Sequence, residues 1–155
     1  MMPAPVRLVT YVMLASLVSS AAFAQTVVAT AAKWDLLGSW RLDCTAPVSR
    51  SNAALSYVVR GGKLFHDRDF GGESKSDSSP VTAATIKPDG TLEITIPFAS
   101  ISATRQFAFV RASDGRIRAL YNRNVDTDEY SIKDGKFTAN GNTTPWQTRC
   151  QKFTN

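Results

Sequence analysis

Apolar and polar residues alternate along most of the chain after residue 36, which is the pattern of β-strands that are buried on one face. The clearest case is the segment 91–99, whose four apolar side chains share one face: Leu92, Ile94, Ile96 and Phe98. The same alternation recurs in three further segments: 54–59, 104–112 and 116–122. No part of this region repeats apolar residues at helical spacing over three turns. The pattern therefore predicts an all-β domain with its core on one face of each strand.

Glycine turns separate these segments and supply the positive φ that tight hairpin loops need. They lie at Gly61-Gly62, Asp89-Gly90, Asp114-Gly115 and Asp134-Gly135. The expected strands cover 38–44, 54–59, 64–70, 81–87, 91–99, 104–112, 116–122, 127–132, 136–139 and 146–153. The serine-rich stretch 73–79 is expected to be a loop. Short strands joined in this way predict an antiparallel up-and-down meander of eight to ten strands, and closure into a barrel would remove its exposed edges.

The alternation also assigns side chains to the barrel interior. We expect an interior formed by ten residues: Trp40, Leu42, Leu92, Ile94, Ile96, Phe98, Phe107, Phe109, Ile117 and Tyr121. Glu93 lies on the opposite face of its strand and is expected to be exposed.

Two cysteines lie near the two ends of the predicted domain, and each is the third member of a similarly spaced strand pattern. Trp40, Leu42 and Cys44 form the first pattern, and Trp146, Thr148 and Cys150 the second: one near each end of the meander. A metal pair or a reactive thiol are the alternatives, but zinc lacks ligands because the chain has one histidine and no CxxC. We predict a Cys44–Cys150 disulfide that joins neighbouring first and last strands, and closing a loop of roughly 100 residues contributes about 4 to 5 kcal/mol.

The first 24 residues have the features of an export signal. Arg7 precedes an apolar run, and Ala22-Phe23-Ala24 is a small-x-small cleavage pattern. The alternative is a membrane anchor, but the run contains several serines and is shorter than the ~20 residues that span a bilayer. The sequence therefore predicts cleavage before Gln25, a flexible arm over 25–35, one β-barrel domain over 36–155, and a bacterial periplasmic or secreted location without stable membrane insertion.

Charge adds little to this description. The whole chain has a formal net charge of +5, and its basic residues are scattered. Such a distribution is typical of a solvated basic surface, so nucleic acid is not an expected partner.

The opening strand, Gly38-Ser39-Trp40, resembles the Gly-x-Trp start of lipocalins and related calycin barrels. The resemblance implies a barrel whose base is closed by Trp40 under an arginine from a late strand. Arg149 is the first choice for that arginine, and Arg123 is the second. The paired ends of the chain also look like small exported bacterial proteins, a likeness that implies no activity.

Candidate chemistry is sparse. His66 is the single histidine, and a lone histidine in a strand is expected to be structural or at the surface. Asp126, Asp128 and Glu129 are expected to form a solvated loop, because their spacing does not fit a calcium loop. No phosphate-binding or nucleophile motif occurs. We therefore predict no enzymatic activity, no cofactor and no metal.

Aromatic residues on several strands can either fill the core or line a cavity. The candidate lining residues are Tyr57, Phe98, Phe107, Phe109 and Tyr121. A cavity would favour a small apolar or amphipathic ligand, whose acidic head group would meet a rim arginine: Arg105, Arg111, Arg116 or Arg118. A filled core would favour a protein partner, as in an inhibitor or interaction module.

Overall fold

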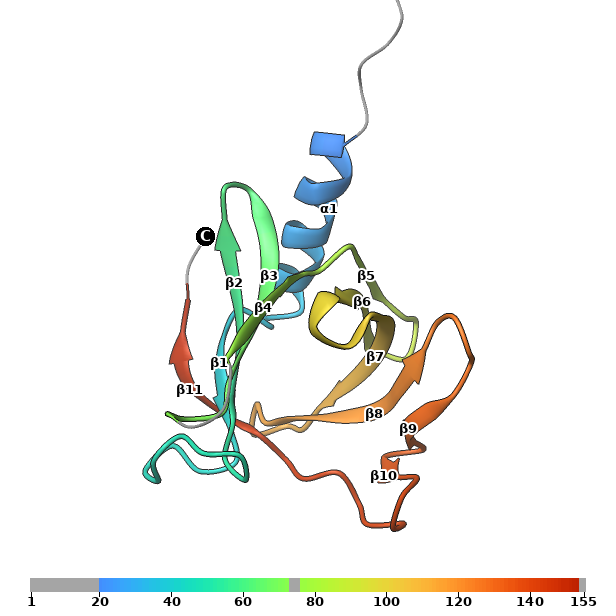
Figure 1. The fold of residues 1–155 in the computed structure, drawn as a ribbon. Helices are drawn as coiled ribbons and strands as arrows, with labels where there is room; N and C mark the ends of the chain where they lie inside the picture. Colours follow the sequence, from blue (N-terminus) through green and yellow to red (C-terminus); the bar gives the residue numbers. More distant parts are fainter. Residues whose placement is uncertain (1–19, 73–75, 154–155) are drawn as a thin grey trace, which may run out of the picture.

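The computed structural model describes residues 20–72 and 76–153, which form two antiparallel sheets and one α-helix (Figure 1). The first sheet contains β1 (Gly38–Arg41), β2 (Ala54–Arg60), β3 (Lys63–Asp69), β4 (Asp77–Pro80) and β11 (Thr148–Lys152), in the order β11-β1-β2-β3-β4. The second contains β5 (Ala83–Ile86), β6 (Leu92–Phe98), β7 (Ala103–Arg111), β8 (Ile117–Asn124), β9 (Tyr130–Lys133) and β10 (Lys136–Phe137), in the order β10-β9-β8-β7-β6-β5. A short 3₁₀ turn, Ala99–Ile101, follows β6. Consecutive strands are neighbours from β1 to β4 and from β5 to β10, so the prediction of a mostly β, antiparallel fold is confirmed, but the strands form two sheets and not one continuous meander.

Neither sheet is closed into a barrel, which differs from the predicted architecture. The sheets meet at two places instead. At one, the backbone N–H of Val81 donates to the carbonyl of Leu64 in the first sheet at 2.9 Å. The next backbone N–H, that of Thr82, donates to the carbonyl of Thr95 in the second sheet, also at 2.9 Å. The chain thus changes sheets between β4 and β5. At the other, Ile117 of β8 and Gln147 exchange backbone hydrogen bonds of 3.1 and 2.8 Å.

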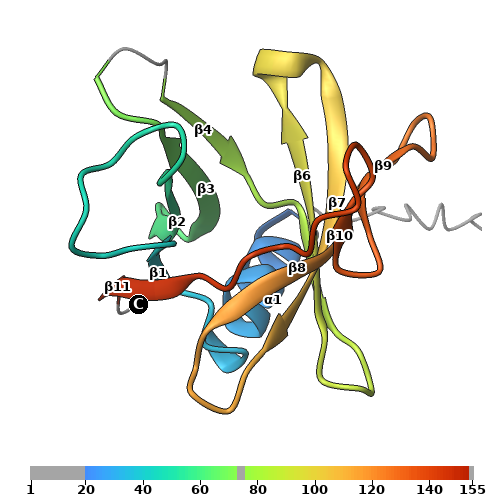
Figure 2. The ribbon, with the colours of Figure 1, turned by 90° about the horizontal axis from the view of Figure 1, so that it is seen from below.

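The two sheets consequently face each other across the interior, as Figure 2 shows from below. The polar segment containing β4 was expected to be a loop, and the single predicted strand 81–87 begins after it. Four residues of β4 pair with β3 despite their polarity, because the strand is at a sheet edge and half of it faces solvent.

Most of the predicted interior is buried. Trp40, Ile94, Ile96, Leu92 and Ile117 are all completely inaccessible to solvent. The four apolar residues of β6 are all buried, as the sequence pattern predicted, and they alternate with half-buried residues. Glu93 is one of these half-buried residues, because it accepts a hydrogen bond from the Tyr121 hydroxyl and pairs with Lys87 at 3.2 Å. The prediction of an exposed Glu93 was therefore wrong.

Two members of the predicted interior lie elsewhere. Leu42 follows the end of β1 and its exposed fraction is 42%. Tyr121 lies on the outer face because β8 contains a bulge. Ala119 pairs with Phe109 but Tyr121 pairs with Ala108, so Leu120 has no partner and the alternation shifts by one residue. A one-residue shift moves every following side chain to the other face.

Residues 25–33 belong to a helix, not to the expected flexible arm. This helix, α1 (Ser20–Lys33), contacts β3 and β5. Val27 and Ala31 are buried in the core, where the small alanine allows close approach. Figure 2 shows α1 at the far end of the space between the sheets. The predicted cleavage point after Ala24 falls within α1, whereas residues 1–19 of the predicted signal lie outside the described residues.

Within the described ranges, no helix is long and apolar enough to cross a bilayer.

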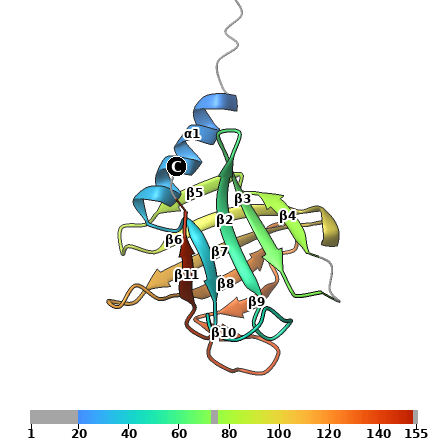
Figure 3. The same cartoon turned by 90° about the vertical axis from the view of Figure 1, so that its left-hand side faces the viewer.

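The predicted disulfide is confirmed. Cys44 and Cys150 are bonded, with their Cα atoms 5.3 Å apart. β1 and β11 pair along their length, so the first and last strands are neighbours in the sheet that faces the viewer in Figure 3. Cys44 lies just beyond the end of β1, and the disulfide therefore fixes the loop that follows this strand to β11.

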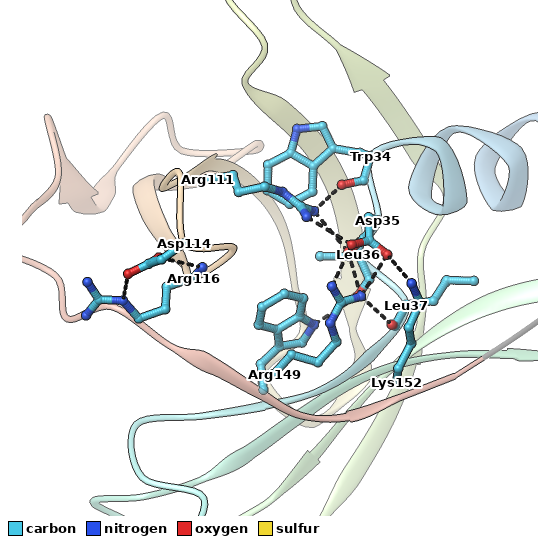
Figure 4. A network of polar contacts seen from close by, with 10 residues as sticks. Trp34, Asp35, Leu36, Leu37, Arg111, Asp114, Arg116, Arg149 and Lys152 are labelled. Atoms are coloured by element: carbon cyan, nitrogen blue, oxygen red, sulfur yellow. Dashed lines mark hydrogen bonds and ion pairs between the residues drawn. The ribbon is translucent and has the colours of Figure 1, made fainter.

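Asp35 ties both ends of the domain together beside α1 (Figure 4). Its carboxylate accepts two hydrogen bonds from Arg149 of β11, at 2.8 and 2.5 Å. Arg111 of β7 and Lys152 of β11 contribute further ion pairs at 3.1 and 3.3 Å. These hydrogen bonds, Arg149 first, hold the pKa of Asp35 well below its usual value, although burial opposes the effect. Asp35 in turn raises the pKa of Arg149.

The two residues expected at the barrel base are in contact at this same place. The guanidinium of Arg149 lies 4.9 Å from the centre of the Trp40 ring, and the Trp40 indole N–H donates to the Leu36 carbonyl at 2.8 Å. Arg111 makes the corresponding contact with the Trp34 ring, at 4.6 Å. Arg149 and Arg111 thus each cover a tryptophan ring, and both pair with the carboxylate of Asp35. Together these contacts close this end of the interior.

Asp35→Asn is expected to lower the free energy of unfolding at pH 7 by about 1 to 2 kcal/mol. The estimate is modest because the Asp35 side chain is 38% exposed. Asparagine tolerates the left-handed backbone of this residue, whose φ is 64°, so the change removes the charge without backbone strain. Urea unfolding measures the effect. Asp114→Asn, which breaks the exposed pair with Arg116, is the control and should leave stability unchanged; equal losses would contradict the special role of Asp35.

Candidate functional site

Five aromatic rings form a closed cycle between the two sheets. Each ring contacts the next, with centre-to-centre distances of 4.7, 6.0, 6.1, 6.0 and 6.2 Å around the cycle. In order, the rings belong to Tyr57, His66, Phe98, Phe107 and Phe109. They come from β2, β3, β6 and β7, so the cycle joins both sheets. Aromatic residues at alternate strand positions produce this arrangement because the two inner faces meet.

A pocket of about 250 Å³ lies against this cycle. Four of the five rings line it, those of Tyr57, His66, Phe107 and Phe109. The rest of the wall comes from strands and from two loops at the end of the domain away from Asp35: Leu42, Arg50, Ser51, Ala53, Leu55, Ala119, Ile132, Phe137, Thr144, Pro145 and Gln147. Most of these side chains are apolar. The volume exceeds the ~150 Å³ that holds one benzene molecule and is below the ~300 Å³ at which pockets for drug-sized ligands begin.

Three of the five residues predicted to line a cavity do so: Tyr57, Phe107 and Phe109. Phe98 belongs to the aromatic cycle and is 3% exposed, but it lines a separate open depression beside Ala99 and not this pocket. Tyr121 is on the outer face of β8, as a result of the bulge at Leu120, and does not line the pocket. Leu42, which was expected in the core, lies at the pocket instead.

The arginines expected at the rim lie elsewhere in the described structure. Arg111 belongs to the Asp35 network, and Arg116 and Arg118 lie over the Trp146 ring at 5.7 and 4.8 Å. Arg105 does not line the pocket either. The arginine that does is Arg50, from the loop between β1 and β2. Sequence alternation could not identify it, because Arg50 is outside any strand.

His66, which was expected to be structural or at the surface, is buried within the aromatic cycle. It is 3% exposed, stacks on Tyr57 at 4.7 Å and 22°, and its Nδ1 atom has no hydrogen-bond partner among the described residues. Burial lowers the pKa of His66 to about 4, and the positive charge of Arg68 adds to this effect. Asp77 and Asp67 oppose it. The imidazole is therefore neutral at pH 7.

This burial predicts a pH-dependent stability. Between pH 6.5 and 4 the unfolded chain binds a proton at His66 and the folded protein does not, so stability falls as the pH is lowered through this range. Between pH 7 and 4.5 we expect a loss of about 2 to 3 kcal/mol from this residue. Urea unfolding at several pH values measures it.

His66→Phe is the matched control and should remove most of the slope. The pKa values of Asp35, Asp67 and Asp77 are also lowered in the folded protein. Their effect on stability falls mainly below pH 3.8, the usual pKa of aspartate, and therefore outside this window. A slope that is the same in both proteins would show that His66 is not buried in its neutral form.

In the two described ranges, no group of three or more His, Cys, Asp or Glu side chains is arranged to hold a metal ion. Asp128 of the acidic loop pairs with Arg123 at 2.7 Å, and Glu129 accepts a hydrogen bond from Thr127 at 3.2 Å. Arg123, the second choice for the barrel-base arginine, is thus engaged at this loop.

Comparisons with family models, with curated proteins and with solved structures found no match for this chain.

Proposed function

We propose that this protein binds a small apolar or amphipathic molecule in the pocket between its sheets. The observation that carries the proposal is the pocket of about 250 Å³ with aromatic walls on both sheets. Buried apolar surface supplies the binding energy in such a site, and a few polar groups orient the ligand. The size favours a single ring or a short aliphatic chain over a long fatty acid. The proposal includes no catalytic step and no cofactor.

The surrounding architecture supports a binding role in an oxidising compartment. α1 and the Asp35 network cover one end of the interior, while the loops with Arg50 and Pro145 surround the pocket at the other. This division into a closed and an open end, together with the Trp40–Arg149 contact, is what a lipocalin-like protein would have. The disulfide is typical of exported proteins, so we propose cleavage before Gln25 and a periplasmic or secreted location.

Titration with toluene tests the proposal, because toluene is apolar and smaller than the pocket. We expect saturable binding by calorimetry. Ala119→Met should weaken it by at least about tenfold, equivalent to ~1.4 kcal/mol, since Ala119 lines the pocket and the larger side chain fills it. Ala29→Met, on the exposed side of α1, is the matched control and should bind like the wild type. Absence of binding to the wild-type protein would refute the proposal.

The alternative is a protein-interaction module. Ile101 and Val125 favour it, because they are large apolar residues with exposed fractions of 52% and 42%. They flank an open depression lined in part by Ala99, Thr104 and Asp126. If titrations find no small-molecule binding, this surface becomes the better candidate for the binding site of the protein.

A further inference from the structure

The wall of the pocket between the sheets has a positive charge and no negative one. Among the described residues that line it there is one arginine, Arg50, and no lysine, aspartate or glutamate. His66 is neutral at pH 7 because burial lowers its pKa to about 4, and Tyr57 is neutral because burial raises its pKa. The other polar lining residues are uncharged: Ser51, Thr144 and Gln147. The charge of the wall therefore favours an anionic group on the occupant.

Arg50 is held at the pocket by a tight turn in the loop between β1 and β2. It lies at the tip of this turn, in which Ser49 and Asn52 exchange backbone hydrogen bonds of 3.4 and 3.1 Å. The side chain of Asn52 is 8% exposed and anchors the turn to Asp43. It donates to the Asp43 carbonyl at 2.9 Å and accepts from the Asp43 N–H at 3.0 Å. Because the backbone of the turn is already fixed, binding there costs little ordering of the loop.

The acidic side chain of the same loop does not face the pocket. Asp43 is the one aspartate or glutamate between residues 42 and 53, and it does not line the pocket. Its carboxylate accepts hydrogen bonds from the hydroxyl and the N–H of Thr45, at 2.7 and 2.8 Å, and from the N–H of Ala46 at 3.3 Å. These bonds, Thr45 first, lower the pKa of Asp43. The loop thus directs its carboxylate to its own backbone and its arginine to the pocket.

The two sides of the pocket suit the two parts of an amphipathic molecule. The rings of Tyr57, Phe107 and Phe109 form apolar wall on the inner side, where a charged group would lose its hydration at high cost. Arg50 is exposed and belongs to the loops at the end of the domain opposite α1, as Figure 1 shows. A charged group that meets Arg50 there keeps part of its water, so the cost of desolvation is smaller. An apolar ring inside and an acidic group at the loop satisfy both sides.

We propose that the pocket selects small monocyclic carboxylic acids, with the ring against Phe107 and Phe109 and the carboxylate at the guanidinium of Arg50. This assignment rests on the proposed function, and it names the class of ligand within it. A planar guanidinium matches a carboxylate with two parallel hydrogen bonds, which lysine cannot reproduce. The acidic group agrees with the expectation from the sequence, but the arginine that meets it comes from a loop and not from a strand.

Phenylacetate and phenylacetamide form a matched pair of probes, because they have nearly the same shape and differ in charge. Calorimetric titration at low salt compares both on the wild type, on Arg50→Gln and on Arg50→Lys. The wild type should prefer phenylacetate at least about fivefold, and Arg50→Gln should remove this preference while the affinity for phenylacetamide changes less than about twofold. Arg50→Lys, which keeps the charge, should restore part of the preference. Added salt should weaken the binding of phenylacetate alone.

Arg60→Gln is the matched control, because it removes the same charge from an exposed arginine that does not line the pocket. It should keep the preference of the wild type, and circular dichroism checks the fold of each variant. The assignment is overturned if the wild type binds both probes equally, or binds toluene and neither probe, or if Arg50→Gln keeps the preference or weakens both probes alike. Toluene binding would preserve the proposed function in each of these cases. If toluene and both probes fail to bind the wild type, the proposed function itself is wrong and the assignment falls with it.

Discussion

Replacing Cys44 and Cys150 together by alanine is expected to lower the free energy of unfolding by about 4 to 5 kcal/mol. The two cysteines are 106 residues apart in sequence, so the disulfide removes much of the freedom of the unfolded chain. In the folded protein β1 and β11 remain paired by backbone hydrogen bonds, and the double variant should therefore keep its native structure. Urea unfolding of both proteins, followed by circular dichroism, measures the difference.

Gln151→Ala is the control for this experiment, because Gln151 is an exposed neighbour of Cys150. It should change stability by no more than about 0.5 kcal/mol. A loss below about 1 kcal/mol in the double cysteine variant would contradict the prediction, since it would mean that the unfolded chain gains little freedom without the bond.

Ile94→Ala is expected to cost about 2 to 5 kcal/mol, the range for truncating a buried aliphatic side chain. Ile94 is completely buried at the centre of β6, between β5 and β7, and the apolar core around it limits collapse of the resulting cavity. Lys63→Ala, at an exposed position of β3, is the reference and should have an effect within about 0.5 kcal/mol. A loss in Ile94→Ala that is as small as that in Lys63→Ala would contradict the assignment of the β6 faces.

Sequence alternation predicted the strands well where one face of a strand is buried and the other is not. β6 is the clearest example, because all four of its apolar residues are buried. The same reasoning failed at Tyr121, since a bulge leaves no mark in a pattern of apolar and polar residues. It also failed at α1, because the prediction of a flexible arm there ignores the high helix propensity of the alanines in this segment. The strands form two sheets and not one barrel because of hydrogen bonds between segments that are distant in sequence. A local pattern of apolar and polar residues does not encode such bonds.

The candidate site was predicted in part. Tyr57, Phe107 and Phe109 could be named because they are aromatic residues on inward faces of strands. His66 was not predicted as a site residue, because a lone histidine in a strand is expected to be structural or at the surface. A signal was present, however: His66 shares its strand face with Leu64, which is almost completely buried, and a polar residue on a buried face needs an explanation.

The last strand carries several of the contacts that hold the domain together. Arg149 reaches Asp35 and Trp40, Cys150 is bonded to Cys44, and Lys152 pairs with Asp35. A growing chain gains these contacts only after residues 149–152 have been synthesised. Until β11 has been added, the first sheet therefore has an unpaired β1 edge, and Trp40 lacks its cover by Arg149. Folding of this domain therefore finishes with the docking of β11, and a chain truncated before Arg149 would lose the disulfide and two of the three ion pairs of Asp35 together.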